Sequence, residues 1–297
     1  MLPDGWQLTE DIDDFLARAG DFLRSRPALH NTPLTDIEKL RTRGADATVF
    51  GLLESGGEVC AIFYRRPRGQ LWITPISTEQ AGALVAHLAG LGHSPSGVLG
   101  DHDTATAFAD AWHQHTGAAP VPFWRTHLYR LGTLTPPQPS PEGQGRVVGG
   151  KDRGHVVRWC REFCVDVGEQ RSIDLIDAGS WSDSRFGDRH FTFWETPDGT
   201  PVSMAAATSI VGGMIRVDPV YTPAHLRGRG YAGAVTVEVS RAALAAGATD
   251  VVLFTDPANP TSNALYQLRV LLHHTRSRLG AWPCETHLPP EDENWRG

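Results

Sequence analysis

Residues 217–233 read VDPVYTPAHLRGRGYAG and carry the strongest structural signal in this chain. A strand pattern ends at Tyr221 and a helical pattern begins at Tyr231, with Gly228 and Gly230 between them. The first amide groups of a helix have no partner within it, and the helix start carries partial positive charge. Glycine has no Cβ, so the backbone can turn tightly and come close to a ligand. This spacing predicts a nest of N–H donors that suits a pyrophosphate group.

Two common nucleotide-binding motifs fit this loop poorly. A P-loop would need Lys and then Ser or Thr after its second glycine, but Tyr and Ala follow at residues 231–232. A dinucleotide-binding fingerprint matches the spacing of Gly228, Gly230 and Gly233, but the loop follows the third strand of a predicted antiparallel set. The acidic residue that this fingerprint requires could only be Asp250, which precedes a strand instead of ending one. A third ligand that such a loop could hold is coenzyme A.

Two motifs resemble the GNAT acetyltransferase superfamily. Arg-x-x-Gly-x-Ala at residues 227–232, between a strand and a helix, resembles the pyrophosphate loop of that family. Residues 255–266, TDPANPTSNALY, resemble its second signature, in which Asn259 precedes Tyr266 by seven positions. The resemblance runs from residue 146 to Tyr266. It implies an α/β (α+β) fold with a mostly antiparallel mixed sheet flanked by helices, and acetyl-CoA as co-substrate without a metal.

The resemblance also implies roles for individual positions. Val220 and Tyr221 would offer backbone groups to the pantetheine arm, where two strands separate. Asn259 and Asn263 would contact the cofactor, and Tyr266 would lie near its sulfur. The amides expected to hold the pyrophosphate belong to Arg227, Gly228, Arg229, Gly230, Tyr231 and Ala232.

The chemistry asked of Tyr266 is acid catalysis. Attack of an amine on the thioester expels a thiolate, whose thiol has a pKa of about 8.5, and a positioned phenol of pKa about 10 can donate a hydrogen bond or a proton as the sulfur leaves. The alternative is that Tyr266 only packs an amphipathic helix. An alkylamine of pKa about 10.4 must also lose a proton before it attacks. Glu195 is the preferred candidate for the base, and Asp218 and His190 are the alternatives.

The stretch GTLTPPQPSPEGQG at residues 132–145 is rich in proline and glycine and predicts a semi-stiff linker. We therefore expect two GNAT-like domains, residues 1–132 and 146–297, joined by a linker at 133–145. Each half is predicted to contain two helices, three strands, a helix, a strand, a helix and a strand. The third strand of the first half leads into PISTEQ at residues 75–80, which has no pair of glycines. The first domain is therefore predicted to be degenerate and to lack the cofactor site, with an unrelated α/β domain as the alternative.

The predicted helices and strands have the following boundaries. In the first half, helices are expected at 11–26, 34–43, 78–91 and 104–115, and strands at 48–54, 58–65, 70–75, 98–99 and 124–131. In the second half, helices are expected at 152–167, 172–185, 231–246 and 260–269, and strands at 146–148, 190–196, 201–208, 214–221 and 250–255. The sequence departs from the family after Tyr266, because no glycine appears until Gly280. We therefore expect altered last strands and little strand structure in residues 282–297.

The composition and charge of the chain exclude several classes of protein and partner. Hydrophobic residues make up 40% and charged residues 21%, which is typical of a globular protein. The net charge is −7 and no long Lys/Arg run occurs, so nucleic acid is not an expected partner. The N-terminus lacks signal-peptide features and no apolar run approaches a membrane span, which predicts a cytoplasmic protein without a membrane partner. Cys160 and Cys164 lack a second ligand pair at metal-site spacing and are expected to be buried apolar side chains.

The resemblance to the GNAT acetyltransferases implies an N-acetyltransferase. It would move an acetyl group from acetyl-CoA to a primary amine by direct attack. The acceptor would be a small molecule or a peptide, and the protein would be a monomer or a homodimer. The alternative is a non-catalytic acyl-CoA-binding sensor or scaffold, since binding needs the glycine loop but not a base.

Overall fold

The structure is a computed structural model and describes residues 5–44, 47–67, 69–267 and 270–280. The described residues form two compact units. One unit comprises residues 5–128, 255–259 and 273–280, and the other comprises residues 129–254, 260–267 and 270–272. The two units therefore do not follow a single cut in the chain. Two strands are shared between them: β6 (Val121–Leu131) and β12 (Val270–Gly280).

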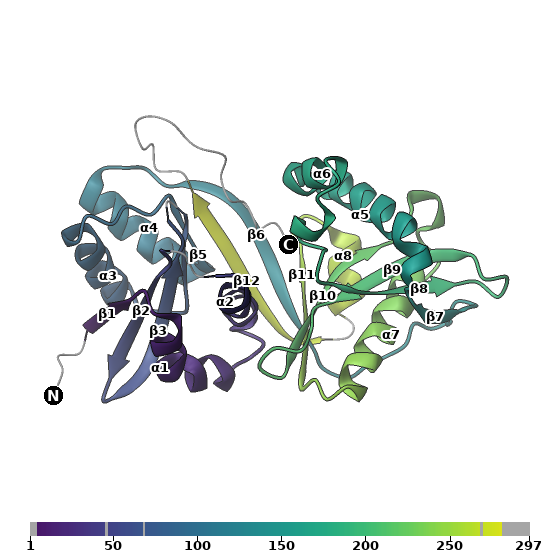
Figure 1. Cartoon of the computed structure of the whole chain (residues 1–297), viewed down its shortest axis with the longest axis horizontal. Helices are drawn as coiled ribbons and strands as arrows, with labels where there is room; N and C mark the ends of the chain where they lie inside the picture. The colour runs from purple at the N-terminus through teal and green to yellow at the C-terminus, as the bar shows by residue number, and fades with distance from the viewer. Residues whose placement is uncertain (1–4, 45–46, 68, 268–269, 281–297) are drawn as a thin grey trace. The chain divides into compact units, whose positions relative to one another are not determined.

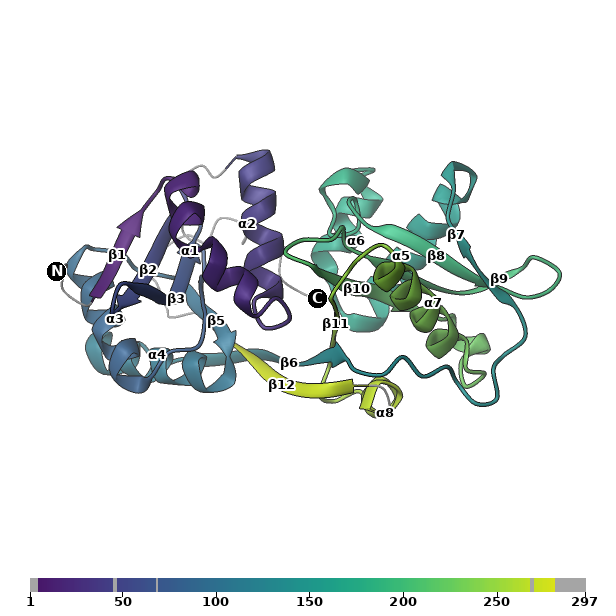
Figure 2. The same cartoon turned by 90° about the horizontal axis from the view of Figure 1, so that it is seen from below.

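The first unit is a mixed sheet with helices on both faces. Its elements are β1 (Gly5–Thr9), α1 (Ile12–Ser25), α2 (Asn31–Arg43), β2 (Val49–Ser55), β3 (Glu58–Arg65), β4 (Leu71–Ile73), α3 (Thr78–Gly90), β5 (Gly97–Asp101) and α4 (His102–Thr116). The strand order is β1-β2-β3-β4-β5-β12. Only β4 and β5 run parallel to each other, whereas residues 276–280 of β12 pair antiparallel with β5. Helices α1 and α2 lie on one face, and α3 and α4 lie on the other (Figure 2).

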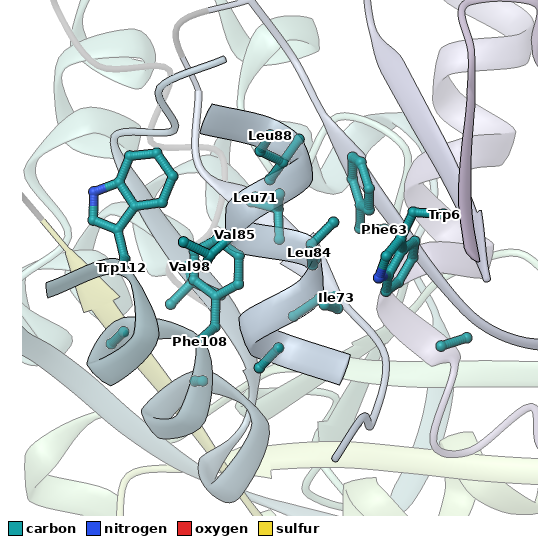
Figure 3. Packing of buried hydrophobic residues seen from close by; sticks show 14 of the residues in the cluster. Trp6, Phe63, Leu71, Ile73, Leu84, Val85, Leu88, Val98, Phe108 and Trp112 are labelled. Atoms are coloured by element: carbon teal, nitrogen blue, oxygen red, sulfur yellow. The ribbon is translucent and has the colours of Figure 1, made fainter. Parts of the chain in front are cut away.

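The core of the first unit lies between the sheet and α3 and α4. Figure 3 shows its side chains converging from β1, β3, β4, β5 and the two helices. Trp6 packs against Phe63 with ring centroids 5.3 Å apart. On the opposite face, Phe15 of α1 stacks on Phe50 of β2 at 4.7 Å. Residues of one strand alternate between the faces, so Phe63 enters the α3 side while the hydroxyl of the next residue, Tyr64, donates to Asp36 of α2.

The second unit has the same plan. Its elements are β7 (Gln144–Val147), α5 (Arg153–Val167), α6 (Gln170–Asp177), β8 (His190–Glu195), β9 (Pro201–Ala207), β10 (Met214–Tyr221), α7 (Tyr231–Ala245), β11 (Asp250–Thr255) and α8 (Pro260–Gln267), with 3-10 turns at Gly150–Asp152, Trp181–Asp183 and Ala224–Leu226. The strand order is β7-β8-β9-β10-β11, antiparallel except for the parallel pair β10–β11. Helices α5 and α6 cover one face and α7 covers the other (Figure 1).

Two separate cores follow from this arrangement. Phe193 of β8 and Met204 of β9 pack with α5 and α6 and belong to the α5-side core. Their neighbours Trp194 and Ala205 pack with α7 and belong to the α7-side core. Cys160 and Cys164 of α5 are fully buried in the first of these cores. Burial raises the pKa of the Cys164 thiol to about 12, so the thiol stays protonated at neutral pH.

The fold class predicted from the sequence is confirmed, and three details differ. Strand β1 was not expected, because Gly5–Thr9 is short and rich in turn-forming and polar residues. The helix expected at 172–185 spans only Gln170–Asp177, because the chain turns through Gly179 with a φ of 76°. Residues 270–280 form β12 where altered strands were expected. The expected tail at 282–297 lies outside the described residues. No helix in the described part of the chain is long and apolar enough to cross a bilayer.

Candidate active site

The parallel strands β10 and β11 separate toward their carboxyl ends. Among the described residues, their pairing joins Met214, Ile215 and Arg216 to Asp250, Val251 and Val252 and ends there. Strand β10 continues to Tyr221, and its register with β9 shifts between Val217 and Val220. Such a bulge bends a strand and increases its twist. The backbone of β10 beyond Arg216 is thus turned away from β11, which leaves an edge that an extended ligand can follow.

The glycine-rich turn follows directly from the end of β10. A 3-10 turn at Ala224–Leu226 precedes it, and Arg227 is extended at φ −66°, ψ 163°. Gly228 and Gly230 have φ values of 77° and 80°, in the left-handed region that costs other residues about 1–2 kcal/mol. A Cβ on Gly228 would meet no atom within 4 Å, so backbone conformation and not crowding requires glycine there. The turn is exposed.

The start of α7 has the open amides that the sequence predicts. Its N-cap is Gly230, and no side chain caps the helix. The corresponding helix of the first unit, α3, is closed by its own residues instead. Ser77 Oγ accepts a hydrogen bond from the Gln80 amide at 3.1 Å, and Gln80 Oε1 accepts one from the Ser77 amide at 2.9 Å. A reciprocal capping box satisfies donors that an anion would otherwise bind, so of these two helices α7 is the one that lacks a side-chain cap at its start.

The side chains around the turn hold its shape. Arg227 Nε donates to the Thr222 carbonyl at 2.9 Å, and its Nη2 forms an ion pair with Asp166 of α5. Arg229 Nη2 donates to the His225 carbonyl at 3.3 Å. Both arginine side chains are therefore engaged at the base of the turn, and the Arg227 amide donates to the Ala224 carbonyl at 3.3 Å. Tyr231 and Ala232 form the first, half-buried turn of α7.

The end of β10 is held by a different set of contacts. Ser203 Oγ donates to the Tyr221 carbonyl at 3.0 Å. The Tyr221 hydroxyl donates to Glu162 of α5 at 2.9 Å, and burial together with this carboxylate raises the pKa of the phenol. Val220 points to the opposite face and packs against the α7-side core. Tyr221 was predicted to offer backbone groups to the pantetheine arm, and its carbonyl already accepts one hydrogen bond.

The second signature lies on and before α8. Tyr266 is buried in the α7-side core, against which Val220 and Tyr231 also pack. Asn263, one turn earlier, is also buried, and its Oδ1 accepts a hydrogen bond from the Tyr129 hydroxyl at 3.1 Å. Asn259 is exposed, falls in the other unit and donates its amide to the Asp256 carbonyl at 3.0 Å. The structure therefore gathers Val220, Tyr231 and Tyr266 into one cluster.

The candidate base Glu195 lies on the α5 side of the sheet. Its Oε1 accepts a hydrogen bond from Arg146 Nε at 2.8 Å, and Arg146 also contacts Asp152 at 2.7 Å. The guanidinium of Arg146 lies 5.5 Å from the centre of the Phe193 ring, within the α5-side core. Glu195 and Tyr266 thus belong to opposite faces of the sheet.

The other two candidate bases are Asp218 and His190. The Asp218 side chain is largely buried, at 15% exposure, and burial alone would raise its pKa, but the neighbouring Arg185 and Arg189 outweigh this and bring the pKa to about 2. Arg185 also donates to Glu169 at 2.6 Å. Such a carboxylate accepts a proton poorly at neutral pH. His190 is exposed, with its Nε2 3.2 Å from Ser209 Oγ.

Solved structures resemble this chain over nearly its whole length. A GCN5-related N-acetyltransferase from Sphaerobacter thermophilus is 18% identical with a TM-score of 0.55, covering 95% of this chain and 98% of its own. A GNAT-family acetyltransferase from Colwellia psychrerythraea is 10% identical with a TM-score of 0.54, covering 93% and 99%. The chain has the GNAT fold. No family model matches the sequence, and no curated protein matches it either.

Within the GNAT fold, some residues around the candidate site could not be found from the sequence. The pairing of Arg146 and Arg185 with the candidate bases shows no short-range pattern, since Glu195 and Asp218 lie 49 and 33 positions away from them. Tyr129 lies 134 positions before Asn263 and precedes the predicted linker. The available signal for Tyr129 was a strand pattern at 124–131, which does not say which sheet the strand will join.

Proposed function

We propose that this protein transfers an acetyl group from acetyl-CoA to a primary amine of a small molecule or peptide. The observation that carries the proposal is the uncapped start of α7, which follows directly from the strand β10 that has separated from β11. Separated strands receive an extended thioester arm, and free helix amides receive its pyrophosphate. Both features occur in one unit, and the GNAT fold supports acyl transfer as the general chemistry.

The proposed reaction has one step. The amine nitrogen attacks the thioester carbonyl, the C–N bond forms, and the C–S bond breaks with departure of the thiolate. Tyr266 donates its phenolic proton to the departing sulfur, a role that favours the transition state over bound substrate. The nitrogen of the new amide loses its extra proton, which restores the Tyr266 phenol. The amides of residues 227–232 orient the pyrophosphate and so fix the thioester relative to Tyr266.

Direct attack is preferred over an acyl-enzyme for a chemical reason. A cysteine nucleophile must ionise before it reacts. Burial raises the pKa of both Cys160 and Cys164, and both lie inside the α5-side core. These thiols are therefore unsuited to carry an acetyl group between acetyl-CoA and the acceptor.

Glu195 is proposed to accept the proton that the ammonium form of the acceptor must lose. Arg146 binds Oε1, so the proposal assigns this role to Oε2, for which no hydrogen bond is found within the described residues. Because Glu195 and Tyr266 belong to opposite faces of the sheet, the proposal requires a chain of waters to carry the proton from the amine to Glu195. Asp218 is not proposed, because its pKa of about 2 makes it a weak base.

The alternative is a module that binds acyl-CoA without transferring the acyl group. It is favoured by the arginine partners of Asp218, whose lowered pKa makes this carboxylate a weak base. The deciding experiment incubates the full chain with acetyl-CoA and a panel of primary amines and measures release of free thiol. Release that depends on the amine supports the transferase. Binding of acetyl-CoA by calorimetry without release for any amine would favour the binding module.

A further inference from the structure

The end of strand β6 belongs to the second unit, although it precedes the proline-rich stretch. Residues 129–131 group with that unit. Tyr129 is 2% exposed and is part of the α7-side core, against which Leu131 also packs. Between them, Arg130 forms an ion pair with the buried Asp250 at the start of β11. These three successive residues thus hold the end of β6 beside the elements that carry the candidate site.

Tyr129 contacts α8 in two ways. Its hydroxyl donates to Asn263 Oδ1 at 3.1 Å, and its ring lies 6.4 Å from the ring of Tyr266, tilted by 46°. Asn263 and Tyr266 are three positions apart and so share one face of the helix. A buried hydrogen bond at one position and a ring contact at the other restrict both the rotation of α8 and the rotamers of Tyr266.

A small apolar cavity lies beside the same two rings. It has a volume of about 30 Å³ and is lined by side chains of β6, α7, β11 and α8, including Tyr129, Ser240, Leu253 and Tyr266. Close packing normally fixes a buried ring in one orientation. Where the packing is incomplete, directed contacts such as the one from Tyr129 to Asn263 matter more for the position of the neighbouring ring.

We propose that Tyr129 is a positioning residue for Tyr266. The proposal rests on the proposed acyl transfer, in which Tyr266 protonates the departing thiolate. Tyr129 does not meet the reacting atoms in this account. It holds α8 through Asn263 and sets the orientation of the Tyr266 ring, so its loss misplaces the acid without removing it. Small misplacements of a catalytic group lower rates strongly while leaving binding nearly unchanged.

The test uses the full chain with the substitution Tyr129→Phe, which removes only the hydroxyl. The expected result is a fall in kcat of about tenfold, with the acetyl-CoA Kd within about twofold of wild type. In a Tyr266→Phe background, the same substitution is expected to have no further effect on kcat, because the acid that it positions is gone. Equal losses in both backgrounds, or an unchanged kcat in Tyr129→Phe, would overturn the proposal.

Tyr64→Phe is the matched control. Tyr64 is also buried and donates its hydroxyl to Asp36, but it lies in the first unit. This variant is expected to lose stability and to keep the wild-type kcat. If Tyr64→Phe lowers kcat as much as Tyr129→Phe does, the effect of Tyr129 is a general loss of stability.

A second readout needs no acceptor. The chain has five tyrosines, so 3-fluorotyrosine labelling gives five fluorine signals that single Phe substitutions assign. Tyr129→Phe is expected to shift or broaden the signal of Tyr266, and Tyr64→Phe is expected to leave it unchanged. An unaltered Tyr266 signal in Tyr129→Phe would overturn the positioning role. If no amine releases CoA, the proposed transfer fails and this signal still decides whether Tyr129 sets the Tyr266 ring.

Discussion

Arg227 donates a hydrogen bond from Nε to the carbonyl of Thr222 over 2.9 Å and so closes the turn between β10 and α7. Its Nη2 reaches Asp166 of α5 at the same time. The turn is therefore held from its base, and Gly228 and Gly230 can keep their left-handed conformations without a bound ligand. A preformed turn lowers the entropy that a ligand must overcome on binding.

Gly230→Glu is expected to abolish acetyl-CoA binding. The carboxylate would stand at the start of α7, where it would repel the pyrophosphate and occupy its place. Gly247→Glu is the control, because Gly247 follows the other end of α7 with a φ of 93° and open space around its Cα. Both variants carry the same left-handed strain and the same charge. Calorimetry should find binding lost only in Gly230→Glu, and equal affinity in the two variants would place the cofactor elsewhere.

One acetyl-CoA is expected to bind per full chain. Helix α7 begins at an uncapped glycine, whereas α3 is closed by the Ser77–Gln80 capping box. Titration calorimetry should therefore give a stoichiometry near one, and Ser77→Gly should not create a second site, because the left-handed turn of Gly228 and Gly230 has no counterpart in residues 75–80. Two sites of similar affinity would contradict the predicted loss of function in the first unit.

Tyr266→Phe is expected to lower turnover far more than it weakens acetyl-CoA binding. The substitution keeps the buried ring and removes the proton donor. Loss of a general acid typically lowers a rate by about 10²–10⁴-fold. The affinity should change little, because the pyrophosphate and pantetheine contacts involve other residues. The measurement compares kcat with the calorimetric Kd, and turnover at the wild-type rate would make Tyr266 a packing residue.

Glu195→Gln tests the proposed base. Glutamine keeps an oxygen for Arg146 Nε but cannot accept a proton. We expect kcat/KM at neutral pH to fall by about 10²-fold or more, with the Kd for acetyl-CoA unchanged. Arg146→Lys controls for the ion pair, since it weakens the Glu195 contact and leaves the carboxylate. A Glu195→Gln rate within a factor of two of wild type would leave Glu195 as a structural partner of Arg146.

Asp218 makes the stability of the second unit depend on pH. Its pKa is about 2 in the folded protein against 3.8 ordinarily, so its contribution of about 2 kcal/mol is complete above about pH 4. This contribution is lost as the pH falls from about 4 toward 2. Asp218→Asn should cost about 3–5 kcal/mol at pH 7, because Arg185 and Arg189 lose a buried partner. The same substitution should also remove the loss of stability between about pH 4 and pH 2 that Asp218 causes. Denaturant unfolding at several pH values measures both effects.

The exposed pair Arg161–Asp177 is the control for this prediction. Exposed ion pairs contribute little to stability, so Asp177→Asn should leave the unfolding curve nearly unchanged at pH 7. If Asp218→Asn behaved like Asp177→Asn, the arginine pairing of Asp218 would not stabilise the fold.

The helices, most strands and the glycine turn could be predicted because their signals are local. The spacing of apolar residues marks α7 and β11, and Gly228 and Gly230 mark a turn with positive φ. The prediction was weakest where an element depends on its partners. The helix after α5 ends early, and β12 forms in a segment where altered strands were expected.

By itself, the sequence determined the GNAT fold class, the loop that opens α7 and the order of the two motifs. These features depend on backbone conformation and on hydrogen bonds between near neighbours. Only the tertiary structure decided that Tyr129 joins Asn263 and that Arg146 binds Glu195. The reason is physical: strand pairing and buried ion pairs join residues far apart in the chain, and their partners depend on how the whole sheet assembles.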